Sequence, residues 1–101
     1  MKLYELKTLH MKNPLGINAK PYFSWKLMSK ENNIVQTAYQ ILVVNGQNET
    51  VWDSGKVLSD TTSFIPYEGK SLVSQTRYTW KVISWDNIGN MATEEAVFET
   101  A

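Results

Sequence analysis

Residues 76–90 read TRYTWKVISWDNIGN, and this stretch decides the fold. Its first half alternates between apolar and polar side chains, as a strand with one buried face does. The residues on the predicted core face are Tyr78, Trp80 and Val82. Ile83 and Trp85 are also large and apolar, yet they fall on the opposite face. The pattern therefore predicts a strand with one core face and an outer face that becomes apolar toward its end.

Strand signals recur along the rest of the chain as short runs of β-branched and aromatic residues between Gly, Pro, Asn and Ser. No window shows a sustained helical period. The expected strands span residues 3–10, 22–28, 37–45, 50–53, 62–66, 77–86 and 94–100. Antiparallel pairing in two packed sheets gives each strand one buried face. The predicted fold class is all-β: a seven-stranded antiparallel β-sandwich.

Size and charge narrow the function classes. The chain has 101 residues, which suits one domain over residues 1–101. Ten basic and ten acidic residues cancel, so neither nucleic acid nor an anionic membrane is an expected partner. There is no cysteine, and no apolar run has the length of a secretory signal or a membrane span. If Met1 is the native start, the missing signal favours the cytoplasm.

The titratable residues do not form a catalytic pattern. His10 is the only histidine, and no nucleophile or orienting group can be placed beside it. Most of the ten carboxylates fall in predicted turns or on polar strand faces. There is no phosphate-binding glycine loop and no cluster with metal-ligand spacing. We expect no catalytic residue, no cofactor and no metal site in this chain.

Aromatic residues are abundant, with four Trp, five Tyr and three Phe. Trp25 and Trp80 share a strand face with other apolar residues and are predicted to be core. Trp52 and Trp85 have no such assignment. One hypothesis is that these two rings are exposed and bind carbohydrate or a protein. The alternative for Trp85 is that its ring lies flat under a local loop.

Two sets of motifs carry a family resemblance. Residues 72–82, LVSQTRYTWKV, resemble the signature of a fibronectin type III domain, an immunoglobulin-like sandwich, in which the Tyr forms a corner with the preceding loop. A second match covers nearly the whole chain and is similar to the N-terminal module of bacterial α-L-rhamnosidases, which are multidomain glycoside hydrolases. Its blocks, in order, are NPLGI at 13–17, FSWKL at 23–27, QTAYQI at 36–41, VWDSGKV at 51–57, TRYTWKV at 76–82, WD at 85–86 and FET at 98–100.

The resemblance implies a noncatalytic module. In that family the catalytic carboxylates lie in a separate (α/α)-barrel domain, so no catalytic residue carries over to this sequence. It also implies that the chain is a fragment of a larger enzyme, whose neighbouring domains are its expected partners. We expect Ile83 and Trp85 to dock on such a neighbour, and Ala38 to lie beside Trp85 if the third and sixth strands pair. The alternative is a carbohydrate- or protein-binding module acting through Trp52 or Trp85.

Overall fold

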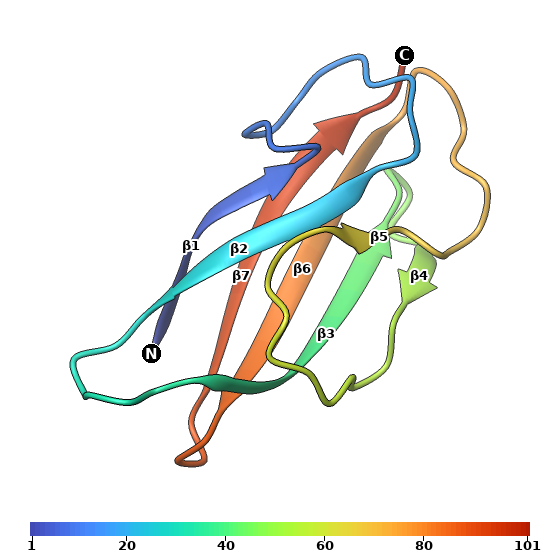
Figure 1. Ribbon diagram of the computed structural model, residues 1–101. Helices are drawn as coiled ribbons and strands as arrows, with labels where there is room; N and C mark the ends of the chain where they lie inside the picture. Colours follow the sequence, from blue (N-terminus) through green and yellow to red (C-terminus); the bar gives the residue numbers. More distant parts are fainter.

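Seven strands form two antiparallel sheets in the computed structural model, which describes residues 1–101 (Figure 1). The smaller sheet has the order β1–β2–β5, with β1 (Lys2–Thr8), β2 (Tyr22–Met28) and β5 (Ile65–Pro66). The larger sheet has the order β4–β3–β6–β7, with β4 (Thr50–Asp53), β3 (Gln36–Val44), β6 (Arg77–Asp86) and β7 (Met91–Glu99). The predicted seven-stranded all-β sandwich is confirmed. None of its segments is a helix that could cross a bilayer.

Two strands end earlier or start later than predicted, and the backbone explains both. β1 ends at Thr8 instead of residue 10, because Leu9 and His10 have φ of 53° and 59° and form a tight turn that returns the chain to Met11. β5 contains only Ile65 and Pro66 instead of residues 62–66. Phe64 has φ of 57°, which an extended strand does not allow.

The turn between the last two strands is tighter than predicted. The Asp86 carboxylate oxygen Oδ1 accepts hydrogen bonds from the N–H groups of Ile88 (3.0 Å) and Asn90 (2.8 Å). An Asp side chain that bonds its own following backbone is a common turn device. β7 therefore starts at Met91, three residues before the predicted start, with Met91 paired to Trp85 of β6.

The core lies between the two sheets and is built from aromatic rings. Phe23 on β2 packs on Trp80 of β6, with ring centroids 4.6 Å apart, and both are fully buried. Tyr78 stacks on Phe98 of β7 at 5.3 Å. Burial of each such side chain contributes roughly 1.5–3 kcal/mol to folding. The predicted inward face of β6 and the core assignments of Trp25 and Trp80 are confirmed.

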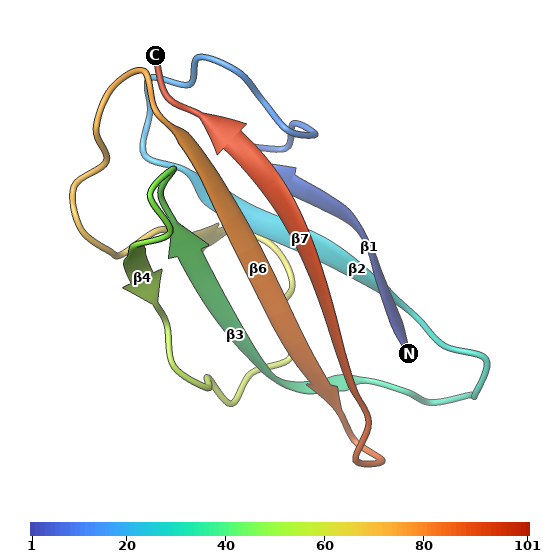
Figure 2. The same cartoon turned by 180° about the vertical axis from the view of Figure 1, so that it is seen from behind.

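Figure 2 shows the larger sheet from its outer face. β3 and β6 are antiparallel neighbours, and Ala38 is paired to Trp85 as expected. Leu42 is paired to Lys81. Trp85 and Ile83 are half-buried on this face, whereas Ala38 is almost completely buried.

A buried amide joins the two sheets and the loop between β4 and β5. Oε1 of Gln36 on β3 accepts hydrogen bonds from Nε1 of Trp25 on β2 (3.0 Å) and from the hydroxyl of Ser84 on β6 (2.8 Å). Its Nε2 donates to the carbonyl oxygens of Ser59 (3.1 Å) and Thr61 (2.8 Å). Both acceptor sites and both donors of the amide are therefore used.

Replacing Gln36 with Ala should destabilise the chain by about 2–4 kcal/mol, because it leaves the indole N–H of Trp25 and the hydroxyl of Ser84 buried without partners. Gln40→Ala is the matched control, since Gln40 makes a single exposed hydrogen bond to Asp53 and should cost at most about 1 kcal/mol. Urea unfolding followed by Trp fluorescence measures both. If both variants lose the same small amount of unfolding free energy, the Gln36 amide does not contribute to holding the two sheets together.

Candidate functional site

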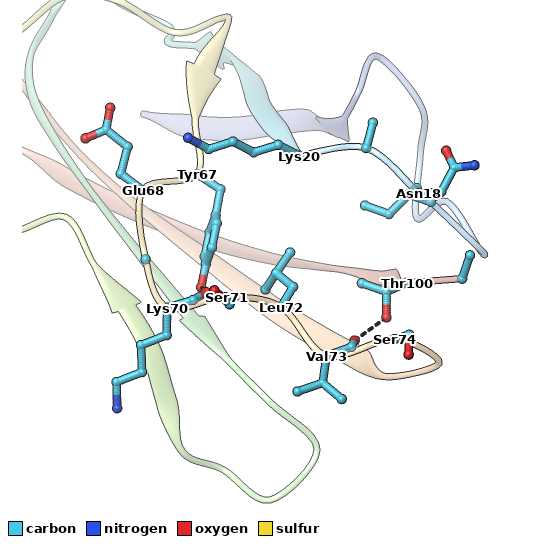
Figure 3. Close-up of a pocket in the computed structure, with 14 residues that line it drawn as sticks. Asn18, Lys20, Tyr67, Glu68, Lys70, Ser71, Leu72, Val73, Ser74 and Thr100 are labelled. Atoms are coloured by element: carbon cyan, nitrogen blue, oxygen red, sulfur yellow. Dashed lines mark hydrogen bonds between the residues drawn. The ribbon is translucent and has the colours of Figure 1, made fainter.

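A cleft of about 720 Å³ opens at the end of the sandwich where the chain reaches its C-terminus (Figure 3). Three segments line it: residues 17–20, residues 67–74 and the pair Thr100–Ala101. We refer to it below as the C-terminal cleft. Loops and the end of a strand build this cleft, so strand periodicity could not predict it.

The wall formed by residues 67–74 is held in place by two hydroxyl groups. The Tyr78 hydroxyl accepts a hydrogen bond from the N–H of Val73 at 2.8 Å, which confirms the predicted tyrosine corner. The Thr100 hydroxyl donates to the carbonyl oxygen of Val73 at 2.6 Å, the bond drawn in Figure 3, and accepts from the N–H of Thr76 at 3.0 Å. With its backbone fixed on both sides, Val73 presents a side chain that is 65% exposed.

Tyr67 anchors the other end of the same wall. Its side chain is buried, and its hydroxyl donates to the carbonyl oxygen of Lys70. Burial raises the pKa of Tyr67 to about 12 from its ordinary 10.0, because the phenolate would lose hydration. The stabilisation that the neutral phenol provides is thus complete below pH 10 and is lost as the pH rises through about 12.

Gly69 lets this wall lie directly on β4. A Cβ at this position would stand under 3.0 Å from atoms of Trp52, Val51 and Tyr67. The Lys70 N–H next to it donates to the carbonyl oxygen of Val51 at 3.0 Å. The position therefore requires a residue without a side chain.

The polar groups of the C-terminal cleft suit contact with another surface. Glu68 is the only acidic side chain in its lining, whereas glycoside hydrolysis generally uses a pair of carboxyl groups. Lys20 extends across the opening toward Tyr67 and Glu68, and Lys70 points away from it (Figure 3). Charges of both signs at the edge of a cleft are typical of the rim of a protein interface, which is polar and accessible to solvent.

The candidate residues from the sequence lie elsewhere on the domain. Trp85 and Ile83 are next to each other on the outer face of β6. The ammonium nitrogen of Lys56 lies 4.5 Å from the centre of the Trp85 ring, so a neighbouring loop covers part of that ring. This local contact corresponds to the alternative that the sequence left open for Trp85.

Trp52 packs against the hydrophobic core. It is half-buried, its ring lies edge-on to Tyr67 with centroids 5.4 Å apart, and it stacks at 6.2 Å on Phe23. The structure thus does not bring Trp52 and Trp85 together. It instead places three other rings, those of His10, Tyr22 and Phe64, on the surface of the smaller sheet. The sequence analysis did not predict this group, since its members come from three separate segments.

The strand order, the two sheets and the tyrosine corner define an immunoglobulin-like β-sandwich domain. The family described as "Rha78A-like, N-terminal immunoglobulin domain" matches residues 3–101, and the chain belongs to this family. The α-L-rhamnosidase of Formosa agariphila is 46% identical over 81 residues, which are 74% of this chain and 9% of that protein. An α-L-rhamnosidase of Streptomyces avermitilis is 40% identical over 85 residues, or 79% of this chain and 8% of the relative.

Solved structures agree with this assignment. The crystal structure of the Streptomyces avermitilis α-L-rhamnosidase complexed with L-rhamnose superimposes with a TM-score of 0.91 and 34% identity, covering 99% of this chain and 10% of that one. The α-L-rhamnosidase from Dictyoglumus thermophilum gives a TM-score of 0.90 and 42% identity, covering 98% of this chain and 12% of that one. The chain therefore spans about a tenth of the length of the relatives that it matches.

Gly69→Ala should lower the free energy of unfolding by about 1–3 kcal/mol, because the new methyl group overlaps the backbone of Val51 and the side chain of Trp52. Gly46→Ala is the matched control. Gly46 has open space around it and no positive φ, so the change should be neutral or raise stability by about 0.4–1 kcal/mol. Urea unfolding curves of both variants provide the comparison. A Gly69→Ala variant as stable as the Gly46→Ala variant would contradict the close approach.

Proposed function

We propose that this domain is a noncatalytic N-terminal module of a multidomain α-L-rhamnosidase, and that it packs against the domain that follows it. The observation that carries the proposal is the position of the C-terminal cleft. In a family described as N-terminal, the rest of the protein continues from the end of the domain. The last strand of the sandwich, β7, ends at Glu99, and Thr100, which follows it, is part of the cleft lining. A chain that leaves β7 toward a following domain therefore leaves beside the cleft.

The chain near Ala101 is hydrogen-bonded to the segments on both sides of it. Its N–H donates to the carbonyl oxygen of Ile17 at 2.8 Å, and its carbonyl oxygen accepts from the N–H of Gln75 at 2.9 Å. A segment fixed in this way gives the next domain a defined starting direction. Val73 and Leu15 are 65% and 70% exposed and supply apolar surface for the contact. Leu15 follows Pro14, whose carbonyl oxygen accepts a hydrogen bond from the N–H of Glu99 at the end of β7.

The outer face of β6 is a second proposed contact, on a different side of the domain. Ile83 and Trp85 remain half-buried there, and Met91, the strand partner of Trp85, is 58% exposed. These three residues form a continuous apolar stripe beyond the part of the ring that Lys56 covers. Such a stripe is suited to an interface between domains.

The cleft contact can be tested by comparing the isolated 101-residue chain with a chain that also carries the following rhamnosidase domains. Amide hydrogen exchange of residues 17–20 and 67–74 should be slower in the longer chain, with the β2–β3 loop at 29–32, at the opposite end of the domain, as an internal reference. Val73→Asp should abolish this extra protection, because it places a charge in the contact, and it should change the stability of the isolated domain by no more than about 0.5 kcal/mol.

Leu58→Asp is the matched control, since Leu58 is 82% exposed and does not line the cleft. It should leave the protection of the cleft unchanged. Equal exchange at the cleft in both chains would overturn the docking proposal. A native gene product of about 11.6 kDa on an immunoblot would overturn the multidomain assignment.

The second contact gives a separate result. Trp85→Ala in the longer chain should raise amide exchange on the outer face of β6 to the level of the isolated domain, because the stripe loses its largest ring. In the isolated chain the same change removes the contact with Lys56 and should cost about 1 kcal/mol. If the longer chain keeps the same stability and protection after the substitution, the outer face of β6 is not an interdomain surface.

A further inference from the structure

Three aromatic rings gather on the outer surface of the smaller sheet. His10 lies edge-on to Tyr22 and to Phe64, with ring centroids 5.1 Å and 4.9 Å apart. Tyr22 and Phe64 stack at 5.5 Å with 28° between their planes. We call His10, Tyr22 and Phe64 the ring cluster. It belongs neither to the core nor to the C-terminal cleft.

The backbone holds these rings outward at an energetic cost. Phe64 is 65% exposed and has φ of 57°. His10 has φ of 59°, in the tight turn between Thr8 and Met11. A left-handed conformation costs roughly 1–2 kcal/mol for a residue with a side chain. Strained residues of this kind tend to occur at binding sites.

A groove of about 320 Å³, lined mainly by polar and charged residues, includes His10 of the ring cluster and runs over β1 and β2. Its lining consists of Glu5, Lys7, His10, Ser24, Trp25, Lys26, Thr62 and Ser63. The register of β1 against β2 shifts between Tyr4 and Lys7, and Glu5 in this bulge forms an ion pair with Lys26 at 2.8 Å. Bulges often redirect side chains beside a functional site. The groove thus offers hydroxyl, ammonium and carboxylate groups next to an exposed aromatic ring.

This combination matches the two kinds of surface on a sugar. One face of a pyranose carries C–H groups and packs on the negative face of an aromatic ring. The hydroxyl groups at its edge need hydrogen-bond partners when they leave water. We propose that the ring cluster and the groove form a carbohydrate-binding site, in which Phe64 carries a pyranose residue of a neutral glycan and the groove binds its hydroxyl groups.

The composition of the groove favours a glycan over a protein partner. The centre of a protein interface is apolar and poor in charge, whereas this groove contains one hydrophobic residue, Trp25, among eight. The site is also separate from the proposed interdomain contacts, so either proposal can fail without the other.

The test is a titration of the ¹⁵N-labelled 101-residue chain with L-rhamnose, D-glucose and D-galactose at millimolar concentrations, followed by NMR amide shifts. At least one of the three sugars should shift amides of residues 8–11, 22–26 and 62–64 saturably, while amides of the C-terminal cleft stay in place. Phe64→Ala should weaken that binding at least tenfold. Leu58→Ala is the control, because Leu58 is exposed in the same β4–β5 connection but lies outside the groove.

A second variant tests the groove of the proposed sugar site without changing Phe64. Ser63→Ala removes an exposed hydroxyl from the groove and should weaken binding several-fold without changing the fold. The proposal is overturned if none of the three sugars shifts these amides. It is also overturned if the shifts persist in Phe64→Ala, or if the following domains protect residues 62–64 from exchange, which would make the cluster a protein contact.

Discussion

The amide of Gln36 is the interaction on which the arrangement of this domain depends. It is buried between the sheets, where an unpaired polar group would be costly, and it makes four hydrogen bonds to four different partners. These partners belong to β2, to β6 and to the long connection between β4 and β5. Their geometry can be satisfied at once only when both sheets and this connection take their observed positions. Apolar packing alone allows more freedom, since it has no direction.

The position of the β4–β5 connection in turn determines two surfaces. The first part of this connection, around Lys56, covers part of Trp85 on the outer face of the larger sheet. Its last part places Thr62, Ser63 and Phe64 at the edge of the smaller sheet, beside Tyr22 and the turn at His10. A single buried amide is thus coupled to both the proposed interdomain stripe and the proposed glycan site.

The strands could be predicted because successive side chains of a strand point to opposite faces, so a buried face produces alternating apolar and polar residues. β6 shows this well, with buried and half-buried residues alternating from Tyr78 to Asp86. The predictions were wrong where left-handed residues interrupt an otherwise suitable sequence. Leu9 and Phe64 are residue types that rarely adopt a positive φ, so β1 and β5 were drawn too long. β7 was drawn too short, because the Asp86 carboxylate closes a tight turn by Asn90 and lets the strand pair with β6 from Met91 onward.

The sequence by itself determined the fold class, the core face of β6, the tyrosine corner and the family, because each of these rests on local periodicity or on a contiguous motif. Only the tertiary structure decided the C-terminal cleft, the partial cover of Trp85 and the ring cluster. Each of these joins residues from separate loops. The distances between the residues of each site depend on how two sheets and three connections pack together, and no local sequence pattern predicts that packing.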